Sequence, residues 1–296
     1  MKLSASTWIF GDEPFEATAQ RLARFGCDGV EPLGEPERFD PHELRETCAR
    51  HGLVPYSVLA MATGRRDLAH PEPDVRAHGE RYLASVLAFA EALGASIVST
   101  IPGSVARVDP VGVEPTEDAW SAGYEREWDL AVASVRRAGQ EAGARGIVLA
   151  VEPINRYETH LLRTAEQARR FVAEVGSPAV KVQLDTFHMS IEESDPAAAI
   201  RATSRDLVNL HLADSNRRAV GDGRLDWPAI LAALLEIGYQ GPLTLEPAPP
   251  EPNLSLAVRM RRNLPLRDRD IEVSVAHLRR VLGGVAMGRP AGHGSV

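Results

Sequence analysis

Four ionisable residues follow apolar, strand-like segments in the second half of the chain. They are Glu152, Asp185, His211 and Glu246. Side chains alternate between the two faces of a strand, and one face of each segment carries leucine or valine. The small or polar residues that share the other face with the four are Ala150, Gln183, Asn209 and Thr244. We therefore expect all four ionisable side chains to point into one interior, while the apolar faces pack against helices.

Three carboxylates crowded around one axis would repel one another and raise one another's pKa. A divalent cation would remove that conflict. Three oxygen donors and one imidazole form a set that suits Mn²⁺, Mg²⁺ or Co²⁺ better than a metal that prefers thiolates. The four residues together predict a metal site, although a single glutamate or histidine at a strand end is most often a rim or core residue.

One local pattern connects these segments to the rest of the chain: an amphipathic helix, a glycine, and then a short apolar strand. The glycines are expected to end helices at positive φ, which other residues adopt at a steric cost. The pattern occurs at Gly26, Gly52, Gly94, Gly143, Gly176 and Gly238. Helix starts agree with it: Asp40 precedes Pro41 as an N-cap, and Thr164 with Gln167 forms a capping-box motif.

Counting the first strand near residues 2–7, the pattern gives eight strands separated by helices. Such alternation implies right-handed parallel crossovers, and eight units in this length suit a closed barrel. We predict a single-domain α/β fold, a (β/α)8 TIM barrel over residues 1–287, with residues 288–296 as a disordered tail. A doubly wound open sheet is the alternative. The long segments 101–118 and 247–267 are expected as loops at the catalytic face.

Composition excludes several classes of function. The 296 residues are 44% hydrophobic and 25% charged, with no apolar run long enough to span a bilayer. The net charge of −8 argues against a nucleic-acid partner, which needs a basic surface. The beginning of the sequence lacks the apolar core of a signal peptide, so a cytoplasmic location is expected. Cys27 and Cys48 are expected to be core thiols.

Further polar residues lie just beyond the same strands. Glu158, His188 and Arg217 are placed where they could contact a polar ligand, or, in the alternative, form salt bridges that fix the loops. Glu31 also ends a strand. It could hydrogen-bond a substrate or only brace the mouth of the barrel, and the sequence leaves the two interpretations even.

At these residues the sequence resembles the xylose-isomerase-like barrel superfamily, and most closely its D-tagatose 3-epimerase/D-allulose 3-epimerase group of ketose 3-epimerases. The resemblance is detailed from about residue 147 to 247 and only topological before that. It is carried by the segments 151–158 (Val-Glu-Pro-Ile-Asn-Arg-Tyr-Glu), 181–189 (Lys-Val-Gln-Leu-Asp-Thr-Phe-His-Met), 191–193 and 221–227.

The resemblance implies that Glu152, Asp185, His211 and Glu246 hold the metal, usually manganese, and that a free keto-sugar is the substrate. It also implies that Glu158, His188 and Arg217 contact the substrate, and that the protein forms a homodimer or homotetramer. The expected reaction is C3 epimerisation of a ketose of the tagatose, fructose, allulose or ribulose type through a metal-stabilised enediolate. Glu152 and Glu246, which come from strands on opposite sides of the substrate, would then remove and return the proton.

Some residues depart from the group. Ala213-Asp214 stands where Gly-Glu is usual, Ala248-Pro249-Pro250 replaces a common aromatic residue, and the arginines between 259 and 269 have no counterpart that we can match. These changes leave the metal site intact but put the substrate in doubt. The alternative is a related barrel acting on another keto-sugar: a hydroxypyruvate or inosose isomerase, or a 3-keto-glycoside epimerase or carbon–glycoside-cleaving enzyme. An apurinic-site endonuclease of the same superfamily would need three zinc ions, several more histidines at strand ends and a basic face, and the sequence shows neither the histidines nor the basic face. A non-catalytic sugar- or metal-binding barrel is a further alternative.

Overall fold

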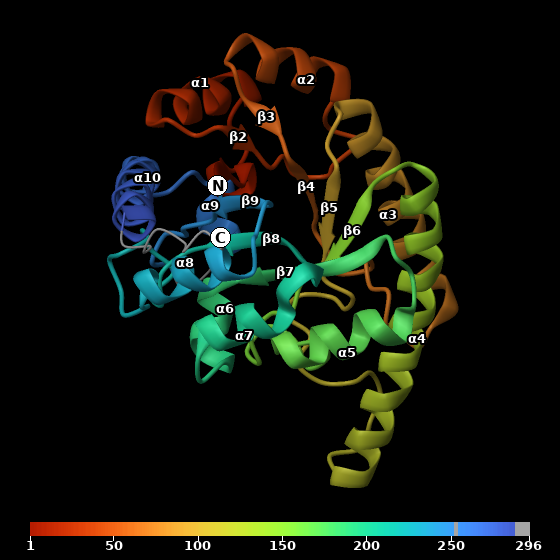
Figure 1. The fold of residues 1–296 in the computed structure, drawn as a ribbon. Coiled ribbons are helices and arrows are strands. Elements are labelled where there is room, and N and C mark those ends of the chain that lie inside the picture. The colour runs from red at the N-terminus through yellow and green to blue at the C-terminus, as the bar shows by residue number, and fades with distance from the viewer. Residues whose placement is uncertain (252–253, 288–296) are drawn as a thin grey trace, which may run out of the picture.

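The computed structural model describes residues 1–251 and 254–287. Its centre is a curled parallel sheet in which sequential strands lie side by side (Figure 1). The order of the seven strands is β1 (Lys2–Ala5), β9 (Pro242–Leu245), β8 (Leu207–Leu212), β7 (Val180–Asp185), β6 (Val148–Val151), β5 (Ile97–Thr100) and β4 (Ser57–Ala60).

A short second sheet closes the ring between β1 and β4. It pairs β2 (Gly29–Val30) with β3 (Val54–Pro55). Backbone hydrogen bonds join this segment to both neighbours: Glu31 N–H donates to the Ala5 carbonyl at 2.9 Å, and Leu59 N–H donates to the Pro32 carbonyl at 3.0 Å. The predicted α/β barrel is therefore confirmed.

The third strand differs from its predicted form. A single strand was expected after Gly52, at residues 53–56, but β3 covers only Val54–Pro55 and pairs with β2, and after a division at Tyr56 the chain continues as β4 (Ser57–Ala60), which pairs with β5. Pro55 has no N–H to donate and lies just before the division.

Helices surround the sheet on its outside (Figure 1). They are α1 (Phe15–Phe25), α2 (Pro41–Arg50), α3 (Pro73–Leu93), α4 (Glu117–Ala144), α5 (Ala165–Val175), α6 (Thr186–Glu192), α7 (Pro196–Thr203), α8 (Trp227–Glu236), α9 (Leu254–Arg259) and α10 (Leu264–Met287), with 3-10 turns η1 (Thr7–Phe10) and η2 (Ser204–Asp206). None of the helices in the described ranges is both long and apolar enough to cross a membrane.

The predicted helix ends are largely confirmed. Asp40 accepts a hydrogen bond from His42 N–H at the start of α2, and Thr164 and Gln167 form both bonds of the capping box of α5. Glycines at positive φ follow α1, α3 and α5. Gly143 was predicted to end its helix, and that was wrong: α4 continues to Ala144, and Gly146 takes the positive φ instead.

The long connections differ from the predicted loops in one respect. Helix α9 and the first turn of α10 lie within residues 247–267, which were expected to be loop. Both cysteines are buried and free, as predicted. The extent of the single domain, residues 1–287, stays a prediction, and the predicted disordered tail at 288–296 lies outside the described residues.

Candidate active site and metal centre

The structure brings the four predicted metal ligands together at the carboxyl ends of consecutive strands. Glu152 follows β6, Asp185 ends β7, His211 lies in β8 and Glu246 follows β9. Each is at most 5% exposed. The Nδ1 atom of His211 lies 3.4 Å from Oε1 of Glu152 and 3.5 Å from Oε2 of Glu246. Ligand atoms of Glu152, Asp185 and His211 all lie within 4.8 Å of one another, as do those of Glu31, His211 and Glu246.

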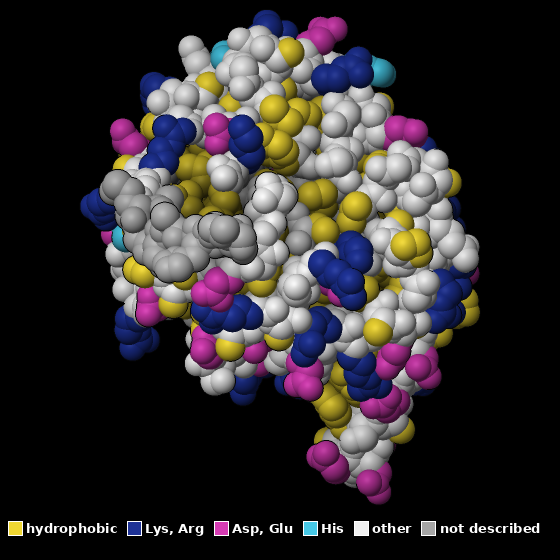
Figure 2. Space-filling model, viewed as in Figure 1, with side chains coloured by type: hydrophobic (Ala, Val, Ile, Leu, Met, Phe, Trp, Pro, Cys, Tyr) yellow, Lys and Arg dark blue, Asp and Glu magenta, His cyan; other side chains and the backbone are white. Residues whose placement is uncertain are grey.

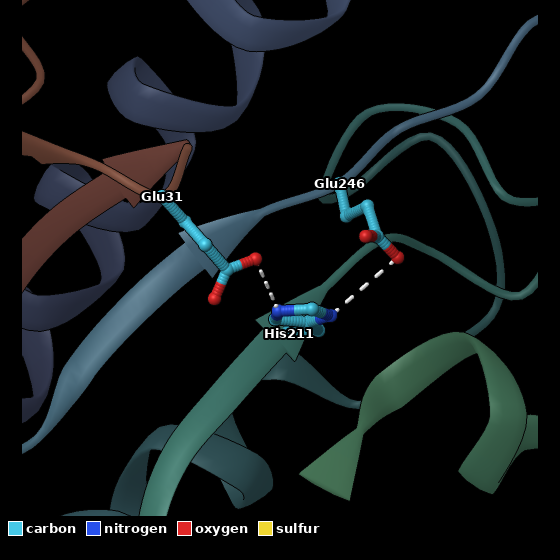
Figure 3. Close-up of side chains that lie close together, drawn as sticks. All are labelled: Glu31, His211 and Glu246. Carbon is cyan, nitrogen blue, oxygen red and sulfur yellow. Dashed lines mark hydrogen bonds and ion pairs between the residues drawn. The ribbon is translucent and has the colours of Figure 1, made fainter. Parts of the chain in front are cut away.

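Glu31 fixes the orientation of His211 from the opposite side of the imidazole (Figure 3). Its Oε1 atom lies 2.9 Å from Nε2 of His211. A carboxylate only accepts hydrogen bonds, so Nε2 carries the proton. In a neutral ring the Nδ1 lone pair then faces Glu152 and Glu246, as in the carboxylate–histidine–metal arrangement that is common in metalloproteins. The sequence left the role of Glu31 open, and the structure shows contact with the histidine.

A buried chain of polar side chains holds Glu31 in turn. Ser57 Oγ donates to Glu31 Oε2 at 2.6 Å, and Asn209 Nδ2 donates to the same oxygen at 3.1 Å. Asn209 also donates to Gln183 Oε1 at 2.6 Å and accepts from Thr244 Oγ1 at 3.1 Å. The polar residues that the sequence placed on the interior face therefore interact with one another beneath the metal ligands.

The electrostatics of the cluster favour a positive charge at its centre. Burial, together with the charges of Glu246 and Glu152, raises the pKa of Asp185 to about 8. Burial opposes protonation of His211, but the charges of Glu31, Glu246 and Glu152 outweigh it and raise the pKa of the imidazole well above its usual value. A set of three carboxylates and one imidazole nitrogen that attracts positive charge fits a divalent cation.

Replacing Glu31 by glutamine is expected to weaken metal binding by about 10- to 100-fold, the usual cost of losing a partner that orients a ligand. Glutamine has one accepting oxygen, so it can accept either from His211 Nε2 or from Ser57 and Asn209, and its NH₂ group must then face the remaining donors. Titration of the protein with Mn²⁺ measures the change. Glu35→Gln is the control, because Glu35 follows Glu31 closely in the chain but pairs with Arg66 and does not contact His211. Equal affinities in the Glu31→Gln variant and the unaltered protein would contradict this role.

A cavity of about 430 Å³ opens above the cluster, within the size range of small-molecule sites. Its polar wall includes Glu152, Glu246, Glu158, His188 and Arg217. Its apolar wall consists of Leu59, Met61, Ile101, Val105, Ala106, Ile154 and Trp8. All the predicted catalytic and substrate-binding residues therefore line one cavity, with Asp185 and His211 beneath it.

Glu158 and Arg217 form an ion pair on this wall. Nη1 of Arg217 lies 3.3 Å from Oε1 of Glu158, and Nη2 lies 4.0 Å from Oε2 of Glu246. The guanidinium also lies 4.7 Å from the centre of the Phe187 ring. The sequence left open whether these residues contact a ligand or form salt bridges. Because both partners of the ion pair line the cavity, the two interpretations are compatible.

His188 is held as a neutral hydrogen-bond donor. Its Nδ1 atom accepts from the backbone N–H of Asn155 at 3.2 Å. Burial, with a smaller effect of the Arg217 charge, lowers the pKa of His188 well below its usual value. The proton of the neutral ring therefore lies on Nε2.

Two site residues had roles that the sequence did not reveal. Trp8, in η1, donates from its indole Nε1 to Glu246 Oε1. Asn155 contacts both Glu158 Oε1, at 2.9 Å, and His188. The Asn155 signal was present, because the residue lies inside the 151–158 segment that carries the resemblance.

The departure at Asp214 has a structural explanation. This carboxylate is fully buried and accepts from Trp227 Nε1 at 2.7 Å and from the backbone N–H of Gly221 at 2.9 Å. Arg217 N–H donates to the Asp214 carbonyl, and Arg217 adopts a φ of 58°. Asp214 thus fixes the turn that presents Arg217 to the cavity.

A family model described as the xylose isomerase-like TIM barrel matches residues 19–264. The chain belongs to this family. Among its relatives, a D-psicose 3-epimerase of Ruminiclostridium cellulolyticum is 32% identical over 77% of this chain and 76% of its own length. A ketose 3-epimerase of Arthrobacter globiformis is 32% identical over 87% of each chain.

Solved structures agree with these relatives. The chain superposes on a structure titled L-ribulose 3-epimerase with a TM-score of 0.83 and 26% identity, covering 97% of this chain and 96% of that one. The resemblance found in the sequence is therefore confirmed. The names of these relatives also confirm the expected enzyme class, an isomerase of the epimerase type.

Proposed function

We propose that the protein epimerises C3 of a free ketose, of the tagatose, fructose, allulose or ribulose type, with the help of a divalent cation. The observation that carries the proposal is that Glu152 and Glu246 meet at the same Nδ1 atom of the buried His211, and that both glutamates line one cavity. Relatives named ketose, D-psicose and L-ribulose 3-epimerases support the substrate class. A homodimer or homotetramer stays a prediction.

Glu152, Asp185, His211 and Glu246 would hold the cation, and Mn²⁺ is the ion we propose, with Mg²⁺ or Co²⁺ as substitutes. When bound, the cation supplies Lewis-acid stabilisation of the negative charge that develops on the substrate oxygens. Glu31 keeps the Nδ1 lone pair of His211 directed at this position, since the bond to Nε2 fixes the tautomer.

The two glutamates are suited to opposite proton transfers. Burial raises the pKa of Glu152. Burial also opposes ionisation of Glu246, but the charge and hydrogen bond of His211, the charge of Arg217 and the Trp8 hydrogen bond lower its pKa to about 2. The two carboxyl groups therefore differ in their affinity for a proton, as is common for pairs of carboxyl groups that exchange protons with a substrate. One removes the C3 proton, and the other delivers a proton to the opposite face.

The other polar residues of the cavity would bind and orient the substrate. His188 donates a hydrogen bond from Nε2–H to a substrate oxygen that gains negative charge. Because burial keeps the ring neutral, His188 stabilises this charge without transferring a proton to the oxygen. Glu158 accepts hydrogen bonds from substrate hydroxyls. Arg217 holds Glu158 in place and adds positive charge beside Glu246.

A direct test follows the C3 proton. The Mn²⁺-loaded protein, incubated in D₂O with D-fructose, D-tagatose or L-ribulose, is expected to produce the C3 epimer with deuterium incorporated at C3, measured by NMR. Formation of an aldose with deuterium at C2 would show aldose–ketose isomerisation instead. The absence of both products and of exchange with all three sugars would overturn the proposed function.

A further inference from the structure

A second cavity of about 250 Å³ adjoins the first, and both are lined by Trp8, Met61 and Thr63. Beyond this shared wall, the second cavity has an apolar lining of Phe15, Leu33, Phe39 and Val258 and a polar lining of Thr7, Asp12, Glu13, Thr18, Arg38 and Arg259. We call this second cavity the apolar compartment. Figure 2 shows hydrophobic side chains gathered in the recessed parts of the face that it draws. The substrate cavity therefore continues into a region of different chemistry.

The apolar part of this lining does not match a free ketose. A ketohexose has an oxygen on every carbon, and burying hydroxyl groups without hydrogen-bond partners costs free energy. Two phenyl rings and two aliphatic side chains offer no such partners. They favour an apolar group, whose removal from water stabilises the complex.

The wall of the compartment is held in place by close backbone contact. Gly11 has a φ of 68°, and a Cβ atom there would lie 2.2 Å from the carbonyl oxygen of Val258. Only glycine permits this approach. It brings α9, which carries Val258, against η1, which carries Trp8.

A buried arginine joins the same two segments, which explains one of the arginines that the sequence could not match. Arg267 is 1% exposed. Its guanidinium donates to the carbonyl of Ile9 in η1 and to the carbonyl of Ala257 in α9, the latter at 3.1 Å, and also to that of Arg262. A buried cation needs such partners. The hydrogen bonds of Arg267 thus hold together η1 and α9, the two segments that bound the compartment.

Most of the charged residues of the lining are ion-paired, although Oε2 of Glu13 is buried without a hydrogen-bond partner among the described residues. Arg38 pairs with Asp12 at 2.7 Å, and Glu13 pairs with Arg21. Arg259 is exposed at the edge. A phosphate group is the competing occupant, because Arg38 and Arg259 both lie on the lining.

We propose that the apolar compartment binds an aromatic or aliphatic substituent on the end of a keto-sugar remote from its carbonyl, so that substituted keto-sugars are better substrates than free ones. This inference rests on the proposed function, since the reacting end of the same molecule must lie beside Glu152 and Glu246. The sugar would occupy the first cavity, and its substituent would pass the shared wall of Trp8, Met61 and Thr63.

Turnover of three ketoses tests the proposal: D-fructose, its 6-O-benzyl ether and its 6-phosphate. The benzyl ether is expected to have a kcat/KM at least about tenfold above that of D-fructose, mainly through a lower KM, as burial of a phenyl ring implies. A benzyl ether no better than D-fructose, or a 6-phosphate better than both, would overturn the compartment while leaving the proposed function intact. Failure of D-fructose itself, with the other free ketoses, would be a failure of the proposed function.

Two variants of α1 supply a matched comparison. Phe15→Ala removes a ring from the compartment, whereas Phe25→Ala removes a partly buried ring at the other end of the same helix. Phe15→Ala is expected to lower the ratio of kcat/KM for the benzyl ether to that for D-fructose by about fivefold or more. Phe25→Ala is expected to leave the ratio unchanged. Equal ratios in the two variants would contradict the proposal.

A binding measurement does not depend on turnover. Calorimetry compares sorbitol, which lacks the carbonyl, with the same polyol carrying a benzyl ether on the corresponding terminal oxygen. The benzyl polyol is expected to bind at least about tenfold more tightly and with a more negative heat-capacity change, the mark of apolar burial. Equal affinities would contradict the compartment even in a protein that turned over no sugar.

Discussion

Glu246→Gln and Glu152→Gln, made separately, are each expected to lower the rate of epimerisation by about a thousandfold or more. Each variant removes one of the two groups that carry the proton, and general acid–base catalysis together with the charge at the site accounts for losses of this size. Glutamine keeps the shape of the side chain, so Trp8 Nε1 can still donate to an oxygen of residue 246 in the Glu246→Gln variant. NMR in D₂O measures both epimer formation and exchange at C3.

The pattern of residual exchange distinguishes two bases from one. If each glutamate serves one face of C3, each variant should still exchange the C3 proton of one epimer while failing to convert it into the other. Because both residues are also proposed ligands, the Mn²⁺ content of each variant is measured beside its rate. Glu91→Gln, which removes a surface carboxylate paired with Arg145, is the control and should retain full activity. Near-normal epimerisation in either active-site variant would eliminate the two-base scheme.

Removal of divalent metal is the second large effect that we expect. A chelator should abolish epimerisation, and Mn²⁺ should restore it. The ion should also stabilise the fold, because it offsets the charge of buried carboxylates such as Asp185, whose pKa is raised to about 8 by burial and by the charges of Glu246 and Glu152. An ion at a hundred times its dissociation constant adds about 2.7 kcal/mol to the free energy of unfolding. For a chain of this length, this corresponds to a rise in Tm of about 4 °C.

Two variants locate that stabilisation. Asp185→Asn removes a proposed ligand and should eliminate most of the Mn²⁺-dependent rise in Tm, measured by differential scanning calorimetry. Glu158→Gln lies in the same cavity but outside the proposed ligand set, and should retain the rise. A chelator-treated protein of unchanged activity, or an equal rise in both variants, would contradict the metal site.

Much of the barrel could be predicted because several local sequence patterns agree with one another. The caps at Asp40 and Thr164 and the alternation of apolar residues in β6, β7, β8 and β9 are properties of short segments. Parallel strands in a ring bring their carboxyl ends to the same rim. Residues that end successive strands on the same face must therefore meet, and Glu152, Asp185, His211 and Glu246 do.

Predictions from local sequence patterns were wrong where the end of a helix or the pairing of a strand depends on the rest of the fold. Gly143 was predicted to end a helix, but α4 continues one residue further, to Ala144, and Gly146 takes the positive φ. The third strand also looked continuous, yet β3 and β4 pair with different partners on either side. A sequence pattern states that a strand forms and leaves open which strand it pairs with.

The sequence by itself determined the barrel, the interior face of each strand and the four side chains proposed to bind the metal, because each follows from periodicity within a few residues. Only the tertiary structure decided that Glu31 orients His211, 180 positions away, and that Arg267 joins η1 to α9 beside the apolar compartment. Such contacts depend on where the ring closes and on which distant segments it then brings together. No local pattern of residues encodes that.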